Sequence, residues 1–228
     1  MPIYNPQILK IDPKETRRYA GLIRAKNFDE KKIVDVCDEA VLMLDVHGVW
    51  KIYDYDAKNF FVQSTPPFQL KGNSITRHLS PCEKVVCIAV TIGEEIENEV
   101  TRRFGVDKYV ESILLDAAAT AAVEQAADAL ESAIAPQLAK DGYKMLTRFS
   151  PGYGDWALDN QKNFFEITGA KEIGMSLSSA MMLIPRKSIT AIIGLKKNKS
   201  DAVSSPDKIC STCEGCTQKD CTAKKIFE

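Results

Sequence analysis

Apolar side chains recur at helical spacing in several stretches of the chain, and the longest stretch predicts a helix at about Val106–Pro136. Alanine occupies several faces of this helix, which permits close packing against neighbouring backbone. Shorter stretches with the same spacing predict helices at about 28–44, 94–104 and 159–167. A further short helix is expected after Asp12, because aspartate is a good N-cap and a proline follows it at the first helical position.

Other stretches are alternating or almost continuously apolar, and they are rich in the β-branched residues that favour strands. Such runs lie at 48–55, 85–92, 173–177 and 189–195, and the run 85–92 has the composition of an interior strand. Strands and helices do not alternate regularly along the chain, and we find neither a P-loop nor a G-x-G-x-x-G turn. The pattern therefore predicts an α+β fold with a largely antiparallel sheet, not a doubly wound nucleotide-binding fold.

The composition excludes several classes of partner. The chain has 228 residues, 45% of them hydrophobic, so it can bury a substantial core. Its 30 basic and 31 acidic residues give a net charge of -1, which argues against nucleic acid as a partner. The N-terminus lacks the basic and apolar regions of a signal peptide, and no apolar run is long enough to span a bilayer. We therefore expect a cytoplasmic protein with no membrane partner.

Composition also divides the chain into a body at 1–195, a polar linker at 196–209 and a cysteine-rich tail at 210–228. Three of the seven cysteines lie in apolar segments of the body: Cys37, Cys82 and Cys87. The other four crowd into the tail. An odd number of cysteines distributed in this way suits a reducing compartment better than a disulfide framework.

The tail cysteines have the spacing C-x2-C-x2-C-x4-C and are Cys210, Cys213, Cys216 and Cys221. Four thiolates this close together can converge on one metal centre if the loop wraps around it. The spacing is near that of a bacterial ferredoxin run without matching it, and either an iron-sulfur cluster or zinc fits the donors. The alternative is a disordered tail that carries free thiols.

One short segment combines a cation, a rigid turn, two glycines and two aromatic residues: Arg148-Phe149-Ser150-Pro151-Gly152-Tyr153-Gly154-Asp155-Trp156. Pro151 restrains the turn, whereas Gly152 allows positive φ and a close approach of backbone amides to a ligand. Arg148 offers a planar charge that suits a carboxylate, and Tyr153 offers a ring face. The segment therefore predicts either a ligand-binding loop or an ordinary Pro-Gly turn.

A row of polar residues follows one edge of the long predicted helix at i, i+4 spacing: Asp116, Thr120, Glu124 and Asp128. Such a row is either a solvated face or a set of acceptors for an ammonium group or ribose hydroxyls. Together with Arg148, it would suit a zwitterionic derivative of an amino acid. The two histidines, His47 and His78, belong to no metal or nucleophile motif, so hydrolytic catalysis has little support.

The segment from Arg148 to Gly154 resembles the R-x-x-P-G-Y segment of the reactivation domain of cobalamin-dependent methionine synthase, which binds S-adenosylmethionine. Further similarities follow in the family's order. They comprise an acidic helix before the loop at Ala127–Glu131, then Gly174–Leu177, then Met182–Pro185 with Ser188 and Gly194. The resemblance covers about residues 80–195 well, is weaker before them and leaves out the tail.

The resemblance implies a curved single α+β domain with a central antiparallel sheet flanked by helices. It also implies that Arg148 pairs with the methionyl carboxylate, that the Phe149 backbone contacts adenine and that Tyr153 lines the pocket near the reacting end. Asp128 matches the family's acidic ligand on the long helix best, and Glu124 is the alternative. A second acidic ligand is expected nearer the N-terminus, where Asp54 and Asp56 are weak candidates.

The chemistry implied by the resemblance is repair of a methionine synthase whose cobalamin has been oxidised to the cobalt(II) state. Reduction coupled to methyl transfer from S-adenosylmethionine restores methylcobalamin, and the electron comes from a reductase or a flavodoxin-like donor. The chain lacks the D-x-H-x-x-G motif of a cobalamin-binding module. It therefore resembles a free-standing subunit that docks on the cobalamin of a methionine synthase or related corrinoid protein, and is not independently catalytic.

Two other hypotheses remain open at this point. The body could be a scaffold, with the tail as an iron-sulfur or zinc-carrying accessory or electron-transfer module for another corrinoid methyltransferase. Alternatively, the chain could be a diverged homologue that keeps the fold for protein interaction and has lost the ligand.

Overall fold

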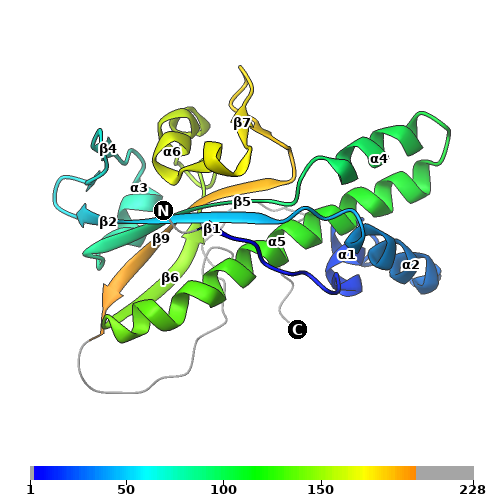
Figure 1. Cartoon of the computed structure of the whole chain (residues 1–228), viewed down its shortest axis with the longest axis horizontal. Coiled ribbons are helices and arrows are strands. Elements are labelled where there is room, and N and C mark those ends of the chain that lie inside the picture. The colour runs from blue at the N-terminus through cyan, green and yellow to red at the C-terminus, as the bar shows by residue number, and fades with distance from the viewer. Residues whose placement is uncertain (1–2, 199–228) are drawn as a thin grey trace.

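A twisted antiparallel sheet crosses the centre of the protein in a computed structural model that describes residues 3–198 (Figure 1). Its seven strands have the order β4-β3-β2-β5-β9-β6, with β1 paired to β2. The strands are β1 (Ile3–Tyr4), β2 (His47–Asp56), β3 (Phe61–Val62), β4 (Phe68–Gln69), β5 (Lys84–Thr91), β6 (Tyr143–Phe149) and β9 (Ser188–Lys197). Every pairing is antiparallel, so the predicted α+β class with a largely antiparallel sheet is confirmed.

The centre of the sheet is β5, which lies between β2 and β9 along its whole length. All of its residues after Lys84 are buried, as the apolar run predicts for an interior strand. Its side chains point alternately to the two faces of the sheet, so Val86, Ile88 and Val90 belong to one hydrophobic cluster, and Val85 and Cys87 belong to another.

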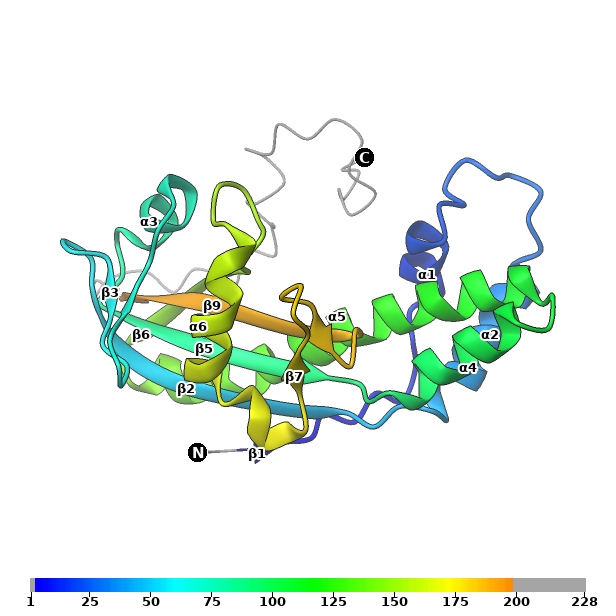
Figure 2. The same ribbon diagram turned by 90° about the horizontal axis from the view of Figure 1, so that it is seen from above.

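The larger cluster lies beneath α5 (Tyr109–Lys140), which crosses one side of the sheet (Figures 1 and 2). Its alanines between positions 117 and 127 are buried against strands and other helices, because a small side chain lets the backbones approach closely. The expectation that this helix ends at Pro136 is wrong, because it continues for one more turn. Leu138 in that turn is 3% exposed, and its packing in the core offsets the hydrogen bond that Pro136 cannot donate.

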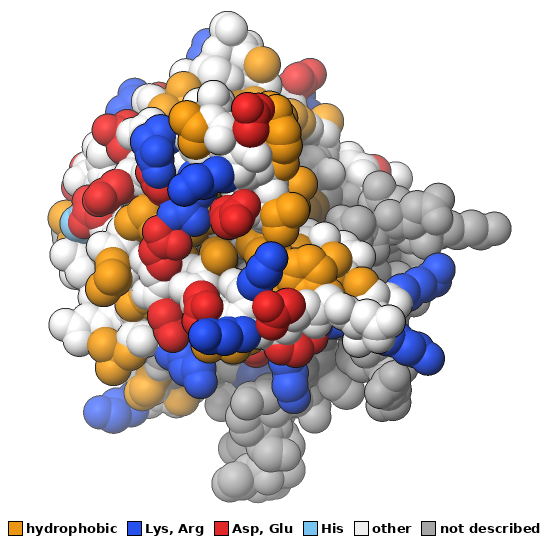
Figure 3. Space-filling view, turned by 90° about the vertical axis from the view of Figure 1, so that its right-hand side faces the viewer, with side chains coloured by type: hydrophobic (Ala, Val, Ile, Leu, Met, Phe, Trp, Pro, Cys, Tyr) orange, Lys and Arg blue, Asp and Glu red, His pale blue; other side chains and the backbone are white. Residues whose placement is uncertain are grey.

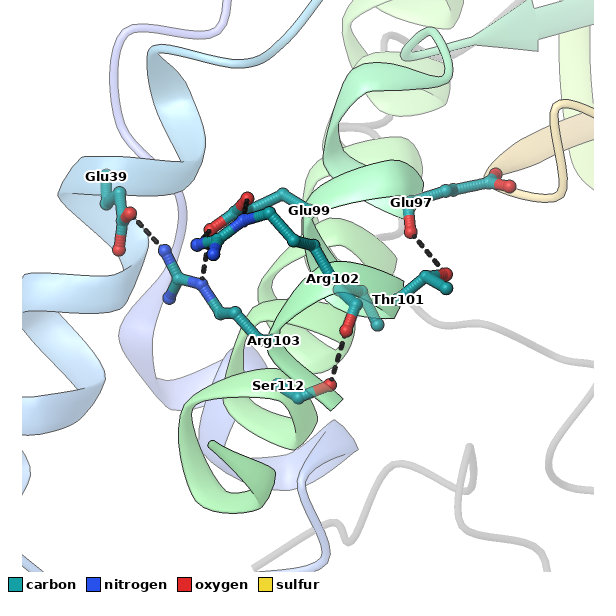
Figure 4. A network of polar contacts seen from close by, with 8 residues as sticks. Glu39, Glu97, Glu99, Thr101, Arg102, Arg103 and Ser112 are labelled. Carbon is teal, nitrogen blue, oxygen red and sulfur yellow. Dashed lines mark hydrogen bonds and ion pairs between the residues drawn. The ribbon is translucent and has the colours of Figure 1, made fainter. Parts of the chain in front are cut away.

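Three further helices gather at one end of the molecule around the N-terminal half of α5: α1 (Pro13–Tyr19), α2 (Glu30–Val41) and α4 (Glu95–Phe104). Figure 4 shows polar contacts that join α4 to α2 and to α5. The buried guanidinium of Arg103 binds Glu99 on its own helix at 2.7 Å and Glu39 on α2. Ser112 on α5 donates to the carbonyl of Val100 at 2.8 Å, so α4 and α5 form a fixed hairpin.

Acid should weaken this helical end through Glu99. Hydrogen bonds from Arg102 and Arg103 lower the pKa of Glu99 from 4.5 to about 2. Because the carboxylate is favoured in the folded state, its contribution is complete above pH 4.5 and is lost as the pH falls towards 2. In urea titrations at pH 6, Glu99→Gln should have a free energy of unfolding about 1 kcal/mol below that of the wild type. At pH 2.5 the difference between the two proteins should be small. An equal loss at both pH values would contradict this assignment.

The opposite side of the sheet carries α3 (Asn73–Leu79), α6 (Gln161–Thr168) and the hairpin β7 (Ser176–Leu177)–β8 (Leu183–Ile184). Two short 3-10 helices, Leu158–Asn160 and Ala170–Ile173, precede and follow α6. The strand expected at 173–177 is therefore wrong in its first half. Gly169 and Gly174 adopt left-handed φ values of 84° and 77°, and they bracket a helical turn that the apolar pattern did not reveal. Within residues 3–198, no helix is both long and apolar enough to cross a membrane.

Candidate functional site

Arg148 and Phe149 lie at the end of an edge strand, whereas the sequence placed them in a loop. They are the last two residues of β6, which pairs with β9. Since alternate residues of a strand point to opposite faces, Arg148 faces α5 and Phe149 packs in the cluster on the other face. The loop itself begins at Ser150. The paired strand therefore fixes the position at which the loop starts.

The guanidinium of Arg148 contacts three carboxylates on α5. Its Nη2 lies 2.5 Å from Glu124 Oε2, and its Nη1 lies 2.6 Å from both Asp128 Oδ1 and Glu131 Oε1. The sequence predicted Glu124 and Asp128 for this site but gave Glu131 no role. Glu131 lies seven residues after Glu124, and positions i, i+4 and i+7 share one face of a helix. This spacing could have identified Glu131 from the sequence.

The electrostatics of this cluster favour a charged Arg148. Burial alone would lower the pKa of Arg148, but Glu131, Glu124 and Asp128 raise it more, so the net shift is upward. Burial raises the pKa of Glu131, and Arg148 opposes that rise. With one cation among three carboxylates, the site as a whole is negative and suits a cationic ligand group.

The loop that follows is closed by its own backbone. The amide of Gly152 donates to the carbonyl of Trp156 at 2.7 Å, and the amide of Tyr153 donates to Ser150 at 3.1 Å. Gly152 adopts a φ of 93°, as the sequence predicted for a residue with access to positive φ. The turn begins at Pro151, and the Tyr153 side chain remains 52% exposed with its ring edge-on to Phe149.

Asp155 and Trp156 anchor the loop, although the sequence gave them no individual roles. The Asp155 carboxylate accepts hydrogen bonds from the amides of Asn73 and Ser74 at 2.7 and 2.8 Å, at the start of α3. These bonds, with that from Ser74 the largest contribution, lower the pKa of Asp155. Trp156 is fully buried, with its ring centroid 5.2 Å from that of Phe164. The loop is therefore tied both to α3 and to the core.

The carboxylate row of α5 is shared between two cations. At its N-terminal end, Lys187 Nζ lies 2.9 Å from Asp116 and 2.8 Å from the hydroxyl of Thr120. Arg148 binds the C-terminal end, through Glu124 and Asp128. The row is therefore ion-paired along its length, unlike a simple solvated face.

The other candidate residues lie in separate contacts. Asp54 pairs with Lys84, and Asp56 accepts hydrogen bonds from Lys58 and Asn59. Neither interaction involves Arg148 or the acidic row. Of the two histidines, His47 pairs with Asp45. His78 lies against β6, with its Nε2 2.9 Å from the carbonyl oxygen of Thr147 and its ring centroid 5.7 Å from that of Phe149.

The described residues offer no alternative metal centre. Cys37, Cys82 and Cys87 are buried free thiols, and burial raises the pKa of all three. Within residues 3–198, no three His, Cys, Asp or Glu side chains form a group that could hold a metal ion. The predicted ligands Cys210, Cys213, Cys216 and Cys221 lie outside the described residues.

Comparisons with known proteins support the fold. No protein-family model and no curated protein sequence matches the chain. Among solved structures, the chain is similar to the MetH reactivation domain bound to AdoHcy, with a TM-score of 0.59 and 13% sequence identity. The similarity covers 89% of this chain and 81% of that domain. This structural similarity, at 13% sequence identity, shows that the two proteins share an α+β architecture.

Proposed function

We propose that the chain binds S-adenosylmethionine at the Arg148 site and supports reductive methylation of a cobalamin-dependent methionine synthase. The observation that carries this proposal is the convergence of Arg148, Glu124 and Asp128 beside the Pro151–Tyr153 turn. The same residues carry the sequence resemblance to an S-adenosylmethionine-binding domain. The fold in which they converge is like that of a domain solved with AdoHcy, the demethylated product of S-adenosylmethionine.

The charge pattern of the site fits a zwitterion with an additional sulfonium. The three ion pairs use three of the N–H donors of Arg148, and a guanidinium has five, so donors remain for the methionyl carboxylate. Glu124 and Asp128 would accept from the ammonium group or the ribose hydroxyls. Their excess negative charge also favours the positive sulfonium of the substrate over the neutral sulfur of the product.

The turn would complete the pocket. Phe149 and Pro151 would place backbone groups against the adenine, and Gly152 leaves room for its close approach. Tyr153, half exposed and edge-on to Phe149, would line the end at which the methyl group is transferred. The methyl acceptor is the cobalamin of a partner protein, which first takes one electron from a reductase or flavodoxin-like donor. The chain itself supplies positioning and electrostatics.

The proposal predicts that the chain restores activity to an oxidised partner. The partner is a cobalamin-binding methionine synthase of the same organism, held in its cobalt(II) form with a one-electron donor and S-adenosylmethionine. Its visible spectrum should convert to that of methylcobalamin when the chain is added, and Arg148→Ala should abolish the conversion. Conversion at the same rate without the chain would contradict the proposal.

The tail supports a second candidate function, that of a metal-carrying accessory protein for a corrinoid methyltransferase. The observation in its favour is the spacing of Cys210, Cys213, Cys216 and Cys221, since four thiolates can complete one metal site. Iron and sulfide analysis after anaerobic purification distinguishes the possibilities. A cluster with visible absorption supports electron transfer, bound zinc supports a structural site, and metal-free protein removes this candidate.

A further inference from the structure

The turn between α4 and α5 exposes an unusual concentration of large apolar side chains. Five such residues within ten positions have exposed fractions between 47% and 59%: Phe104, Val106, Tyr109, Val110 and Ile113. We call these five residues the hairpin surface. They lie at the helical end of the molecule, where Figure 3 shows hydrophobic side chains gathered in a band between charged ones. Contiguous apolar surface of this kind marks interaction sites more often than it marks free surface.

The hairpin surface combines a ridge with a hollow. Phe104 and Tyr109 stack edge to face, with ring centroids 5.0 Å apart, and together they form an aromatic ridge. This ridge borders an open cavity of about 290 Å³, whose apolar lining is Tyr19, Val100, Phe104, Ile113 and Ala117 and whose polar lining is Ser112, Asp116 and Thr120. A protruding ridge and a hollow on one surface are what two identical surfaces need in order to interlock.

We propose that the hairpin surface is a dimer interface, occupied by the same surface of a second copy of this chain. In an isologous contact, the ridge of each copy enters the hollow of the other. The Phe104 and Tyr109 rings are suited to this role, because buried aromatic residues dominate the energetics of interfaces. This inference does not depend on the proposed function, since the Arg148 cluster lies on later turns of α5.

The charges beside the apolar residues are also self-complementary. Lys108 and Glu111 are both exposed and flank Tyr109 and Val110 along the chain. In an antiparallel two-fold arrangement, Lys108 of one copy meets Glu111 of the second copy, and the symmetry repeats the pair. A parallel arrangement would instead bring like charges together, so these residues also select the orientation.

The hairpin surface is already formed in the isolated chain. Arg103 ties α4 to α2 through Glu39, and Ser112 ties α5 to the carbonyl of Val100 (Figure 4). A preformed surface loses less conformational entropy on association than a mobile one. With α4 and the start of α5 fixed in this way, two copies would form a four-helix contact.

Sedimentation of the full chain over a range of concentrations tests the proposal. We expect a monomer–dimer equilibrium, and Val110→Glu should raise its dissociation constant roughly a hundredfold, because the symmetry places the change in the interface twice. Ile184→Glu, which alters a similarly exposed residue on β8, should leave the constant unchanged. Thermal unfolding of both variants at the same temperature as the wild type would show that they fold. A monomer at concentrations up to about 1 mM, or a dimer indifferent to Val110→Glu, would overturn the proposal.

Charge reversal then tests the orientation. Lys108→Glu and Glu111→Lys should each raise the dissociation constant roughly tenfold, because each places like charges opposite one another. The double variant restores opposite charges and should recover most of the affinity. Such recovery would show that these two charges face each other across the contact, and a double variant weaker than both single variants would overturn the arrangement.

Discussion

Arg148→Ala is expected to weaken binding of S-adenosylmethionine by about 3 kcal/mol, a factor of roughly a hundred or more. The substitution removes the proposed partner of the methionyl carboxylate and leaves three carboxylates without their cation. These carboxylates would then repel the ligand carboxylate directly. Both effects act in the same direction, so this variant should lose more affinity than any other single substitution in the site. Calorimetric titration of folded protein measures the loss.

Two companion variants separate charge from geometry. Arg148→Lys keeps a positive charge but loses the planar fork, so we expect an intermediate affinity. Arg186→Ala removes an exposed arginine that contacts Glu97 at 3.4 Å and takes no part in the Arg148 ion pairs, so it should bind like the wild type. If Arg148→Ala and Arg186→Ala bound equally well, the assignment of the carboxylate to Arg148 would be wrong.

Trp156→Ala should lower the free energy of unfolding by about 3–5 kcal/mol, the largest stability effect that we expect at the loop. The indole is fully buried between Phe149 and Phe164, with ring centroids 6.2 and 5.2 Å away. Removing it leaves a cavity where the loop meets the core. Because Trp156 packs on Phe149, we also expect the turn to be displaced in the variant that still folds. Its ligand binding should therefore be weaker.

A matched variant distinguishes volume from polarity. Trp156 Nε1 has no hydrogen-bond partner among the described residues. Trp156→Phe therefore removes part of the ring volume without breaking a hydrogen bond. We expect a cost of about 1–2 kcal/mol for this change in chemical unfolding experiments. If Trp156→Ala and Trp156→Phe cost the same, the indole would not be filling the cavity as described.

Much of the scaffold could be predicted because its signals are local. The apolar run of β5 and the alanine-rich, helically spaced run of α5 each specify one element, and the structure confirms both. The Asp12–Pro13 start of α1 is confirmed as well, with the Asp12 side chain accepting from the amide of Lys14. Such signals arise within a few residues, so they can be recognised in the sequence without knowledge of the tertiary contacts.

The contacts that complete the site could not be predicted, because they join distant segments. The α3 helix went unpredicted, and Asp155, at a sequence separation of 82 from Asn73, caps its start. Similarly, the sequence suggested that Arg148 and the acidic row bind opposite ends of one ligand. In the structure they bind each other, and only the pairing of β6 with β9 and its packing on α5 brings them together.

Binding of S-adenosylmethionine through its carboxylate can be tested by one calorimetric comparison. The full chain is titrated with S-adenosylmethionine and with its decarboxylated analogue, which keeps the adenosine, the sulfonium and the amine. We predict saturable one-to-one binding of S-adenosylmethionine and binding of the analogue that is weaker by roughly a hundredfold. Absence of binding to S-adenosylmethionine, or equal affinity for both compounds, would contradict the account.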